Sequence, residues 1–263
     1  MLRNQNCQKY WSDRIATLPS APELPLVQLP SALKKPRFKR FSAELAARDW
    51  QRLKSKAHEI NLTASGILLA AFSDVLSYWS KAPHFTINLT LFNRLPLHPQ
   101  VNQIVGDFTS LTLLEVDNSV AATFVERAQR LQGRLWEDLD HSYVSGVEVQ
   151  RELRRQRGTY QAMGVVFTST LGFSNISEQN WLANHLGEMV YCITQTPQVW
   201  LDHQLREEEG ALLFNWDVIE ELFPANLLDD MFNRYCNYLK QLATDETIWM
   251  EKYPSLLPPQ QLD

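Results

Sequence analysis

The sequence predicts an α/β fold in which helices flank a mixed β-sheet. Segments with the periodicity of a helix alternate along the chain with segments that have the periodicity of a strand. The chain has 263 residues, which fits one large domain or two lobes that share an interface. Hydrophobic residues make up 44% of the chain and aromatic residues 11%, enough to build a substantial core.

The first 40 residues predict a helix, an extended segment and the start of a strand. The pattern over 7–18 is helical, and four prolines between residues 19 and 30 then prevent a helix and favour an extended crossing segment. The basic run over 34–40 is interpreted as a solvated lead into a strand. The alternative is a contact for phosphate or for an acidic carrier domain.

Two consecutive helices are predicted next. Apolar residues recur at three- and four-residue steps over 46–60, which predicts an amphipathic helix. A second apolar stripe covers 67–79, and the side-chain oxygen of either Asn61 or Thr63 can cap this helix. Both stripes are interpreted as core surfaces rather than as cofactor sites.

The strands come mainly from the remainder of the chain. Residues 85–91 alternate between apolar and polar side chains, which predicts a strand with one buried face. Residues 111–116 are more uniformly apolar, which favours a strand that is covered on both faces. Further patterns predict helices over 124–135, 146–157 and 225–243, and strands over 164–168, 189–195, 198–205 and 211–216.

Charge and composition exclude several classes of protein. The net charge of −5 argues against a general nucleic-acid-binding protein. No run approaches the roughly 18 to 20 apolar residues that a membrane span needs, and the N-terminus has no apolar signal core. The three cysteines form no C-x-x-C pair, which indicates reduced thiols and a cytoplasmic protein. Cys192 is interpreted as a core residue of the predicted 189–195 strand.

The common catalytic and binding motifs are absent from the sequence. There is no G-x-G-x-x-G, P-loop, H-E-x-x-H or G-x-S-x-G segment. The six histidines are scattered without metal-ligand spacing, so we expect no metal site. The chain also has no His-His pair and no two aspartates five residues apart. A search for general motifs therefore identifies no enzyme class.

Five segments, in order, nevertheless carry a specific pattern. They are L-P-S-A-P-E-L-P-L-V-Q-L-P at 18–30, L-S-Y-W at 76–79, G-D-F-T-S-L-T-L-L at 106–114, V-V-F-T-S-T-L at 165–171 and T-Q-T-P-Q-V-W-L-D at 194–202. The pair Trp216-Asp217 follows after 13 further residues. This pattern resembles the heterocyclization branch of the condensation domain superfamily of nonribosomal peptide synthetases. Gly164 departs from it, because the family has proline before V-V-F-T-S.

The resemblance implies both a fold and a domain organisation. The expected fold is the C-terminal, chloramphenicol-acetyltransferase-like lobe of a condensation-type domain, with a mixed sheet flanked by helices. Residues 1–30 would form an N-terminal helix and a proline-rich inter-lobe segment, 31–250 the lobe itself, and 251–263 a C-terminal linker. The family's D-x-x-x-x-D motif belongs to an N-terminal lobe, which would lie upstream of residue 1.

The resemblance also implies a reaction. In this family two lobes enclose a tunnel, and upstream and downstream peptidyl or aryl carrier proteins insert substrates tethered to phosphopantetheine. An acyl or peptidyl thioester condenses with Cys, Ser or Thr, and loss of water then closes a thiazoline or oxazoline ring. Siderophores and peptide metabolites are the implied products. No metal or diffusible cofactor is implied for the lobe, and the implied partners include no nucleic acid and no membrane.

Each site residue follows from its position in the family pattern. Asp202 is the expected catalytic carboxylate, and Thr168 is its expected hydroxyl partner. Expected substrate-binding residues are Asn93, Ser169, Gln195 and Gln198, although strand alternation allows only some of the predicted set to face the tunnel. Asp107, Trp216 and Asp217 are expected to be structural, and Asp107 either caps backbone amides or contacts substrate. Without the family pattern, an aspartate in an apolar strand is more often structural than catalytic.

Three functions remain open from the sequence. The first is one half of a heterocyclization enzyme, which we do not expect to be active as an isolated lobe. The second is a non-catalytic module that docks carrier proteins, for which the arginines at 151, 154, 155 and 157 supply positive charge. The third is the inactive remnant of a truncated synthetase gene.

Overall fold

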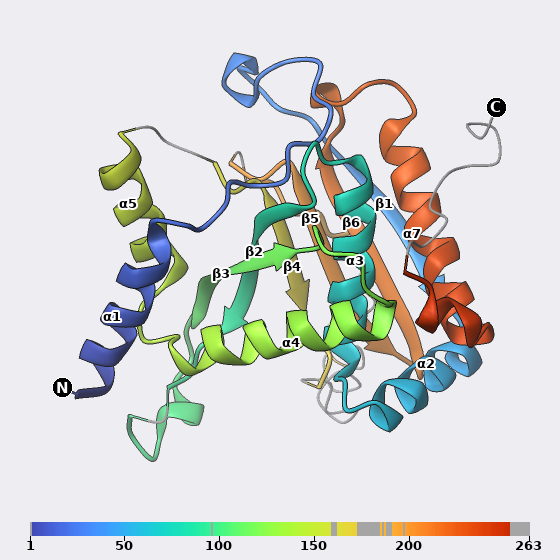
Figure 1. Cartoon of the computed structure of the whole chain (residues 1–263), viewed down its shortest axis with the longest axis horizontal. Coiled ribbons are helices and arrows are strands. Elements are labelled where there is room, and N and C mark those ends of the chain that lie inside the picture. Colours follow the sequence, from blue (N-terminus) through green and yellow to red (C-terminus); the bar gives the residue numbers. More distant parts are fainter. Residues whose placement is uncertain are drawn as a thin grey trace.

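A computed structural model describes residues 2–95, 97–158, 162–172, 185, 187, 191–196 and 198–252. One six-stranded sheet organises them, in the order β1-β6-β5-β4-β2-β3 (Figure 1). The strands are β1 (Phe38–Leu45), β2 (His84–Phe92), β3 (Thr109–Asp117), β4 (Val165–Ser169), β5 (Leu201–Glu208) and β6 (Ala211–Ile219). β4 runs parallel to both β2 and β5, and the other neighbours are antiparallel. The sheet is therefore mixed, and the predicted α/β class is confirmed.

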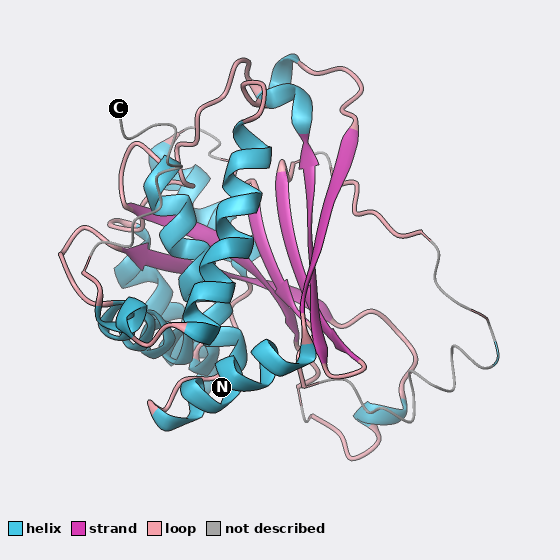
Figure 2. Ribbon diagram, turned by 90° about the vertical axis from the view of Figure 1, so that its right-hand side faces the viewer, coloured by secondary structure: helices cyan, strands magenta, loops and turns pink. Residues whose placement is uncertain are grey.

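Most of the helices that the structure describes gather on one face of this sheet (Figure 2). The helices are α1 (Leu2–Ile15), α2 (Ala47–Glu59), α3 (Ala64–Trp79), α4 (Phe124–Asp140), α5 (Gly146–Arg157) and α7 (Leu227–Thr244). Short 3-10 turns are η1 (Pro30–Ala32), η2 (Val101–Gln103), η3 (Glu220–Leu222) and η4 (Thr247–Met250). Three helix starts are fixed by side chains. Thr63 caps α3 by accepting from the Gly66 N–H, and Thr123 and Ser145 begin capping boxes with Glu126 and Glu148.

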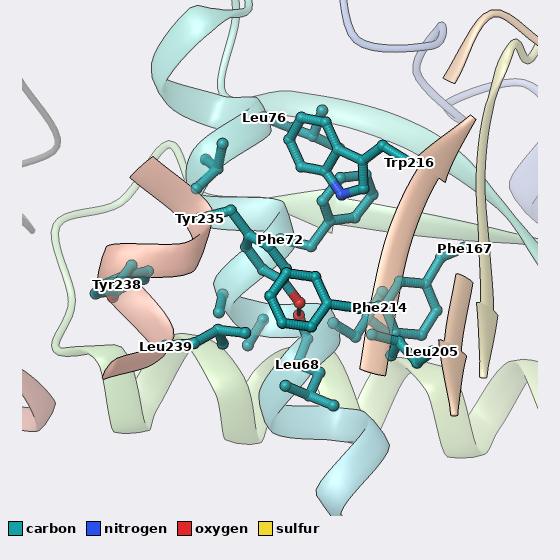
Figure 3. Close-up of a cluster of buried hydrophobic side chains, with 14 of the residues drawn as sticks. Leu68, Phe72, Leu76, Phe167, Leu205, Phe214, Trp216, Tyr235, Tyr238 and Leu239 are labelled. Carbon is teal, nitrogen blue, oxygen red and sulfur yellow. Dashed lines mark hydrogen bonds between the residues drawn. The ribbon is translucent and has the colours of Figure 1, made fainter. Parts of the chain in front are cut away.

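The main core fills the space between the sheet and the helices α2, α3, α4 and α7 (Figure 3). Phe72 of α3 lies at its centre, with ring centroids 5.6 Å from Trp216 and 6.1 Å from both Phe167 and Tyr235. Phe72 and Trp216 are fully buried. Alternating residues of β4, β5 and β6 supply the sheet side of this core, because successive strand side chains point to opposite faces.

A second, smaller cluster covers part of the opposite face. Trp11 and Ile15 of α1 pack with Val149 and Leu153 of α5 against Leu113 of β3. The neighbouring residue Leu114 belongs to the main core instead. Strand β3 is thus covered on both faces, as the apolar run over 111–116 predicts.

The proline-rich segment crosses the molecule in an extended form. It joins β2 at one end, where the Thr86 N–H donates to the Ser20 carbonyl at 2.8 Å. At the other end the Val27 N–H donates to the carbonyl of Leu222 in η3, also at 2.8 Å. The expectation of a crossing segment is therefore confirmed, while the preceding helix begins and ends earlier than predicted.

Two further sequence predictions differ from the structure. Residues 191–196 form no strand, so the strand predicted over 189–195 is wrong for its described part, and 189 and 190 lie outside the described residues. The strand predicted to begin at 198 begins at Leu201. In the first case Tyr191 and Cys192 are exposed and the backbone of 191–196 joins no strand ladder, which periodicity alone cannot detect.

Among the described residues, no single helix has the length and apolar character to cross a membrane. The pair α2 and α3 meets that test only when taken together, and the two helices are bent by 100° at their junction.

Candidate functional site

The site lies on the sheet face opposite the main core, where two rows of side chains cross neighbouring strands. The strand register aligns Arg40, Asp217, Asp202, Val166 and Asn88 in the first row. Ser42, Asn215, Gln204 and Thr168 form the second row, and Thr168 bonds to Thr90 of β2. Residues paired in register share a face, so this half of the sheet presents a mostly polar surface.

Asp202 occupies the second position of β5 and is 5% exposed. Its Oδ2 accepts a hydrogen bond from Gln204 Nε2 at 2.7 Å, while its Oδ1 has no partner among the described residues. Burial raises the pKa of this carboxyl, and the nearby negative charge of Asp217 adds to the rise. Hydrogen bonds from Gln204 and Thr194 and the charge of Arg40 oppose it. The net result is a carboxyl that holds its proton more tightly than an ordinary aspartate.

Asp217 is the register partner of Asp202 and is held by a positive neighbour. Arg40 Nε and Nη2 donate to its two carboxylate oxygens at 2.6 Å each. The Thr194 N–H donates to Asp217 Oδ2 at 2.6 Å. These three bonds engage both oxygens of the Asp217 carboxylate, and its structural role stays a prediction.

Thr168 lies on β4, one step along the sheet from Asp202. Its register partner on β5 is Gln204, so Thr168 and Asp202 are diagonal neighbours on the same face. The Thr168 hydroxyl donates to Thr90 Oγ1 at 2.8 Å. A cavity of about 390 Å³ opens here, and it is lined by Arg40, Ser42, Thr168, Thr170, Tyr191, Cys192, Gln204, Leu205, Arg206 and Asn215. Thr168 and Gln204 thus line the cavity, whereas Asp202 lies diagonally from Thr168 on the same sheet face and is not among the lining residues.

Sequence reasoning missed four residues of this site: Arg40, Thr194, Gln204 and Asn215. Two signals were present in the sequence. Gln204 follows Asp202 by two positions and so shares its face in any strand. Thr194 is the first residue of the T-Q-T-P-Q-V-x-L-D segment, and it bonds to Gln204 as well as to Asp217. No local pattern identifies Arg40 or Asn215, because their roles depend on how distant strands pair.

The predicted substrate-binding residues do not gather around Asp202. Ser169 points to the helix-covered face, where its hydroxyl lies 2.8 Å from that of Ser65. Asn93 follows the end of β2, and its Nδ2 donates to the Ser142 carbonyl at 3.4 Å. Gln195 and Gln198 are exposed on the segment before β5. Their role in binding substrate stays a prediction.

Two further motif residues have structural surroundings. Asp107 is exposed, and its Oδ1 accepts the Thr109 N–H at 2.8 Å where β3 begins. The hydrogen bonds from Thr109 lower the pKa of Asp107. This geometry fits the backbone-capping alternative. Trp216 faces the main core and takes no part in the polar rows.

Cys192 lies where the predicted strand did not place it, whereas His203 follows the alternation of β5. Cys192 is exposed at the rim of the cavity, so its interpretation as a core residue is wrong, and the reason is that residues 191–196 are not a strand. His203 lies between Asp202 and Gln204 in sequence but points into the main core, 2.9 Å from the Tyr235 hydroxyl. Burial lowers the pKa of His203 to about 3, which keeps it neutral.

The glycine that departs from the family pattern packs under an indole ring. A Cβ at Gly164 would lie 2.1 Å from Trp200 Cε3. The Gly164 carbonyl accepts from the N–H groups of Trp200 and Leu201 at 2.9 and 3.1 Å. The absence of a side chain at Gly164 therefore makes room for the Trp200 ring where β4 and β5 begin. Trp200 precedes Asp202 by two residues.

Within the part of the chain that the structure describes, no group of three or more His, Cys, Asp or Glu side chains is arranged to hold a metal ion.

Comparison with known proteins places this fold and site in a family. Condensation domains match residues 2–260 of the chain. Pyochelin synthetase PchF of Pseudomonas aeruginosa is 42% identical over 264 residues, covering 98% of this chain and 14% of that protein. Phenyloxazoline synthase MbtB of Mycobacterium tuberculosis is 38% identical over 249 residues, covering 95% of this chain and 18% of that protein. The chain thus spans less than a fifth of these relatives.

A solved structure supports the same assignment. The cyclization-docking bidomain of the nonribosomal peptide synthetase EpoB from Sorangium cellulosum is 44% identical, with a TM-score of 0.83. The match covers 97% of this chain and 50% of that chain. The predicted condensation-type lobe is confirmed by this agreement. The chain therefore belongs to the condensation domain family, and within it is related to the heterocyclization domains of nonribosomal peptide synthetases.

Proposed function

We propose that this chain forms one lobe of a heterocyclization domain. In that role it condenses a carrier-bound acyl or peptidyl thioester with Cys, Ser or Thr and then removes water to close a thiazoline or oxazoline ring. The observation that carries the proposal is the placement of Asp202. This carboxyl is buried, its pKa is raised, and it lies diagonally from Thr168, which lines the neighbouring cavity.

The proposed chemistry assigns the proton transfer to Asp202 and a hydrogen bond to Thr168. After condensation, the side-chain sulfur or oxygen of the new residue attacks the amide carbonyl. Loss of water then requires a base for the amide proton and a donor for the departing oxygen. Asp202 serves as the base, since a raised pKa brings a carboxylate closer to the pH at which it must accept a proton. The proton that Asp202 takes from the amide nitrogen passes to the departing hydroxyl, which leaves as water, so Asp202 returns to its carboxylate form. Thr168 donates a hydrogen bond to that departing oxygen.

Substrates reach this site on carrier proteins in the proposal. Upstream and downstream peptidyl or aryl carriers present thioesters on phosphopantetheine, and the lobe itself needs no metal or diffusible cofactor. A second lobe that carries the D-x-x-x-x-D motif completes the tunnel. The names of the two relatives, a pyochelin synthetase and a phenyloxazoline synthase, support a product that contains a heterocycle, of the siderophore or peptide-metabolite class.

The test is reconstitution of the complete domain. This chain is mixed with a matching N-terminal lobe and with carriers loaded with an acyl group and with cysteine, and the thioester products are followed by mass spectrometry. We expect condensation followed by loss of one water. Asp202→Asn is expected to abolish the loss of water, whereas Asp13→Asn, at an exposed aspartate of α1, is expected to leave it intact.

Two results would contradict the proposal. If the lobes associate and the carriers are loaded but no condensed product forms, the chain is a docking module or an inactive remnant. If the ring forms equally well with Asp202→Asn, the catalytic carboxylate lies elsewhere.

A further inference from the structure

We propose that Gln204 is a positioning residue for Asp202. Its side-chain amide holds Oδ2 of the carboxylate in place and leaves Oδ1 as the oxygen that receives the substrate's amide proton. This inference rests on the function proposed above and adds a residue for which the family pattern of 194–202 provides no role.

The amide nitrogen of Gln204 uses both of its hydrogens. Nε2 donates to Asp202 Oδ2 at 2.7 Å and also to the hydroxyl of Thr194. The amide oxygen Oε1 accepts a hydrogen bond from Asn215 Nδ2 at 3.3 Å. Three partners from three different segments therefore surround one side-chain amide, which leaves it little freedom to rotate.

These partners also fix which way the amide points. If the amide were turned by 180°, its oxygen would face the Asp202 carboxylate and its nitrogen would face the amide nitrogen of Asn215. Both contacts would pair like with like, because a carboxylate accepts only and an amide nitrogen donates only. The orientation that places Nε2 on Asp202 is thus imposed by Asn215 and Asp202 together.

Asn215 is itself held firmly. It is 4% exposed and is the register partner of Gln204 on β6. Its backbone carbonyl lies 3.3 Å from His203 Nδ1 on the other face of the sheet. Strand β6 therefore holds Asn215 in place, Asn215 holds the Gln204 amide, and Gln204 in turn holds Asp202.

The arrangement gives the two carboxylate oxygens different tasks. Oδ2 is occupied by Gln204, and Oδ1 has no partner among the described residues although it is buried. A buried carboxylate oxygen without a donor is costly unless something else satisfies it. In the proposed reaction the amide N–H of the condensed substrate donates to Oδ1, and its proton then passes to that oxygen.

The first experiment reads the carboxyl directly and needs no catalysis. The chain is labelled with ¹³C at aspartate carboxyl carbons, and the Asp202 signal is assigned by its absence in Asp202→Asn. Gln204→Met keeps the length of the side chain but removes the donor, so the pKa of Asp202 is expected to rise further. Gln150→Met is the matched control, since the Gln150 amide bonds to Asn88 on the same sheet face at 3.1 Å, away from Asp202. We expect no change in the Asp202 titration for this control.

The second experiment uses the reconstituted domain described above. A hydrogen bond to a charged group that is lost corresponds to a rate decrease of about 10- to 100-fold. Gln204→Met is therefore expected to slow ring closure by that factor and to accumulate the condensed but uncyclised thioester. Gln204→Glu has a donor only when its carboxyl is protonated, so its ring closure is expected to recover as the pH is lowered.

The two experiments separate the possible failures. An unchanged Asp202 titration in Gln204→Met overturns the inference, whatever the activity. Ring closure at the wild-type rate and with the wild-type pH profile in Gln204→Met overturns it as well. If the wild-type domain forms no ring, the proposed function fails, and the titration alone then decides whether Gln204 holds Asp202.

Discussion

Arg40 donates two hydrogen bonds of 2.6 Å to Asp217 directly beside Asp202 in the first row of the polar sheet face. The Asp217 side chain is fully buried, while Arg40 keeps 22% of its side chain exposed. The pair therefore offsets part of the cost of burying a negative charge and limits how strongly Asp217 repels a charge on Asp202.

Removing the guanidinium is expected to destabilise the lobe. Arg40→Met leaves the Asp217 carboxylate buried without its positive partner, which costs about 3 kcal/mol of unfolding free energy. Urea denaturation measures the loss. Arg37→Met is the control, because the pair of Arg37 with Glu221 is exposed, and its loss is expected to be much smaller. Equal losses for the two variants would show that Asp217 does not depend on Arg40.

A pH-dependent stability is expected from Asp138. This side chain is fully buried, and burial raises its pKa from 3.8 to about 6, although Arg14 and Tyr10 oppose the rise. The folded protein then binds this proton more tightly than the unfolded chain. The resulting stabilisation is complete below pH 4 and is lost as the pH rises through 6, about 2 to 3 kcal/mol in all.

Asp138→Asn isolates that contribution. The unfolding free energies of wild type and Asp138→Asn are measured by urea denaturation at pH 4, 5, 6 and 7. With rising pH, the unfolding free energy of the wild type is expected to fall relative to that of Asp138→Asn. Asp13→Asn, at an exposed aspartate, serves as the comparison. A difference that stays constant with pH would place the pKa of Asp138 near that of the unfolded chain.

Gly164 is expected to tolerate no side chain. Gly164→Ala forces a Cβ against the Trp200 ring and is expected to cost about 1 to 3 kcal/mol, as overpacking does. Adding Trp200→Leu is expected to recover part of that loss, and thermal denaturation of the two single variants and the double variant gives the coupling. Gly133→Ala in α4 is the control, since a Cβ there meets nothing within 4 Å and is expected to stabilise the helix. Strict additivity of Gly164→Ala and Trp200→Leu would contradict the matched packing.

Thr168→Val separates the proposed chemistry from stability. The change keeps the shape and removes only the hydroxyl that bonds to Thr90 Oγ1, so the loss of stability is expected to be about 1 kcal/mol. Ring closure in the reconstituted domain is expected to fall at least about 10-fold if this hydroxyl contacts the departing oxygen. Thr244→Val, at an exposed threonine at the end of α7, is expected to change neither. Wild-type ring closure in Thr168→Val would remove Thr168 from the mechanism.

The sequence predicted the fold well where a single local pattern decides the structure. The alternation over 85–91 identified β2, and the apolar stripe over 67–79 identified α3, since burial against one partner fixes both patterns. Residues 191–196 were misread because short apolar runs carry no information on whether a neighbouring strand is present. The basic run over 34–40 was interpreted as the lead into a strand, but the partner of β1 could not be predicted, because its pairing with β6 is a long-range property.

The candidate site likewise contains residues that a local sequence pattern identifies and residues that only the three-dimensional structure reveals. Asp202 and Thr168 could be named from the family pattern, and strand alternation would have added Gln204 to their face, although Gln204 was not predicted. Ser169 was placed beside Thr168 in the prediction although consecutive strand residues point to opposite faces, and it bonds to Ser65 of α3. Arg40 and Asn215 needed the three-dimensional structure, because β1 and β6 bring them to the site from opposite ends of the chain.

Strand β5 alternates between the two faces of the sheet, with Asp202 and Gln204 on the polar side and His203 inside the aromatic core between them. A deletion or insertion of one residue in β5 would exchange these positions and put a carboxylate among Phe72, Trp216 and Tyr235. Substitutions along β5 act on one face at a time, but a change in its length acts on both. Evolution can therefore vary the length of this protein between its strands far more freely than within β5.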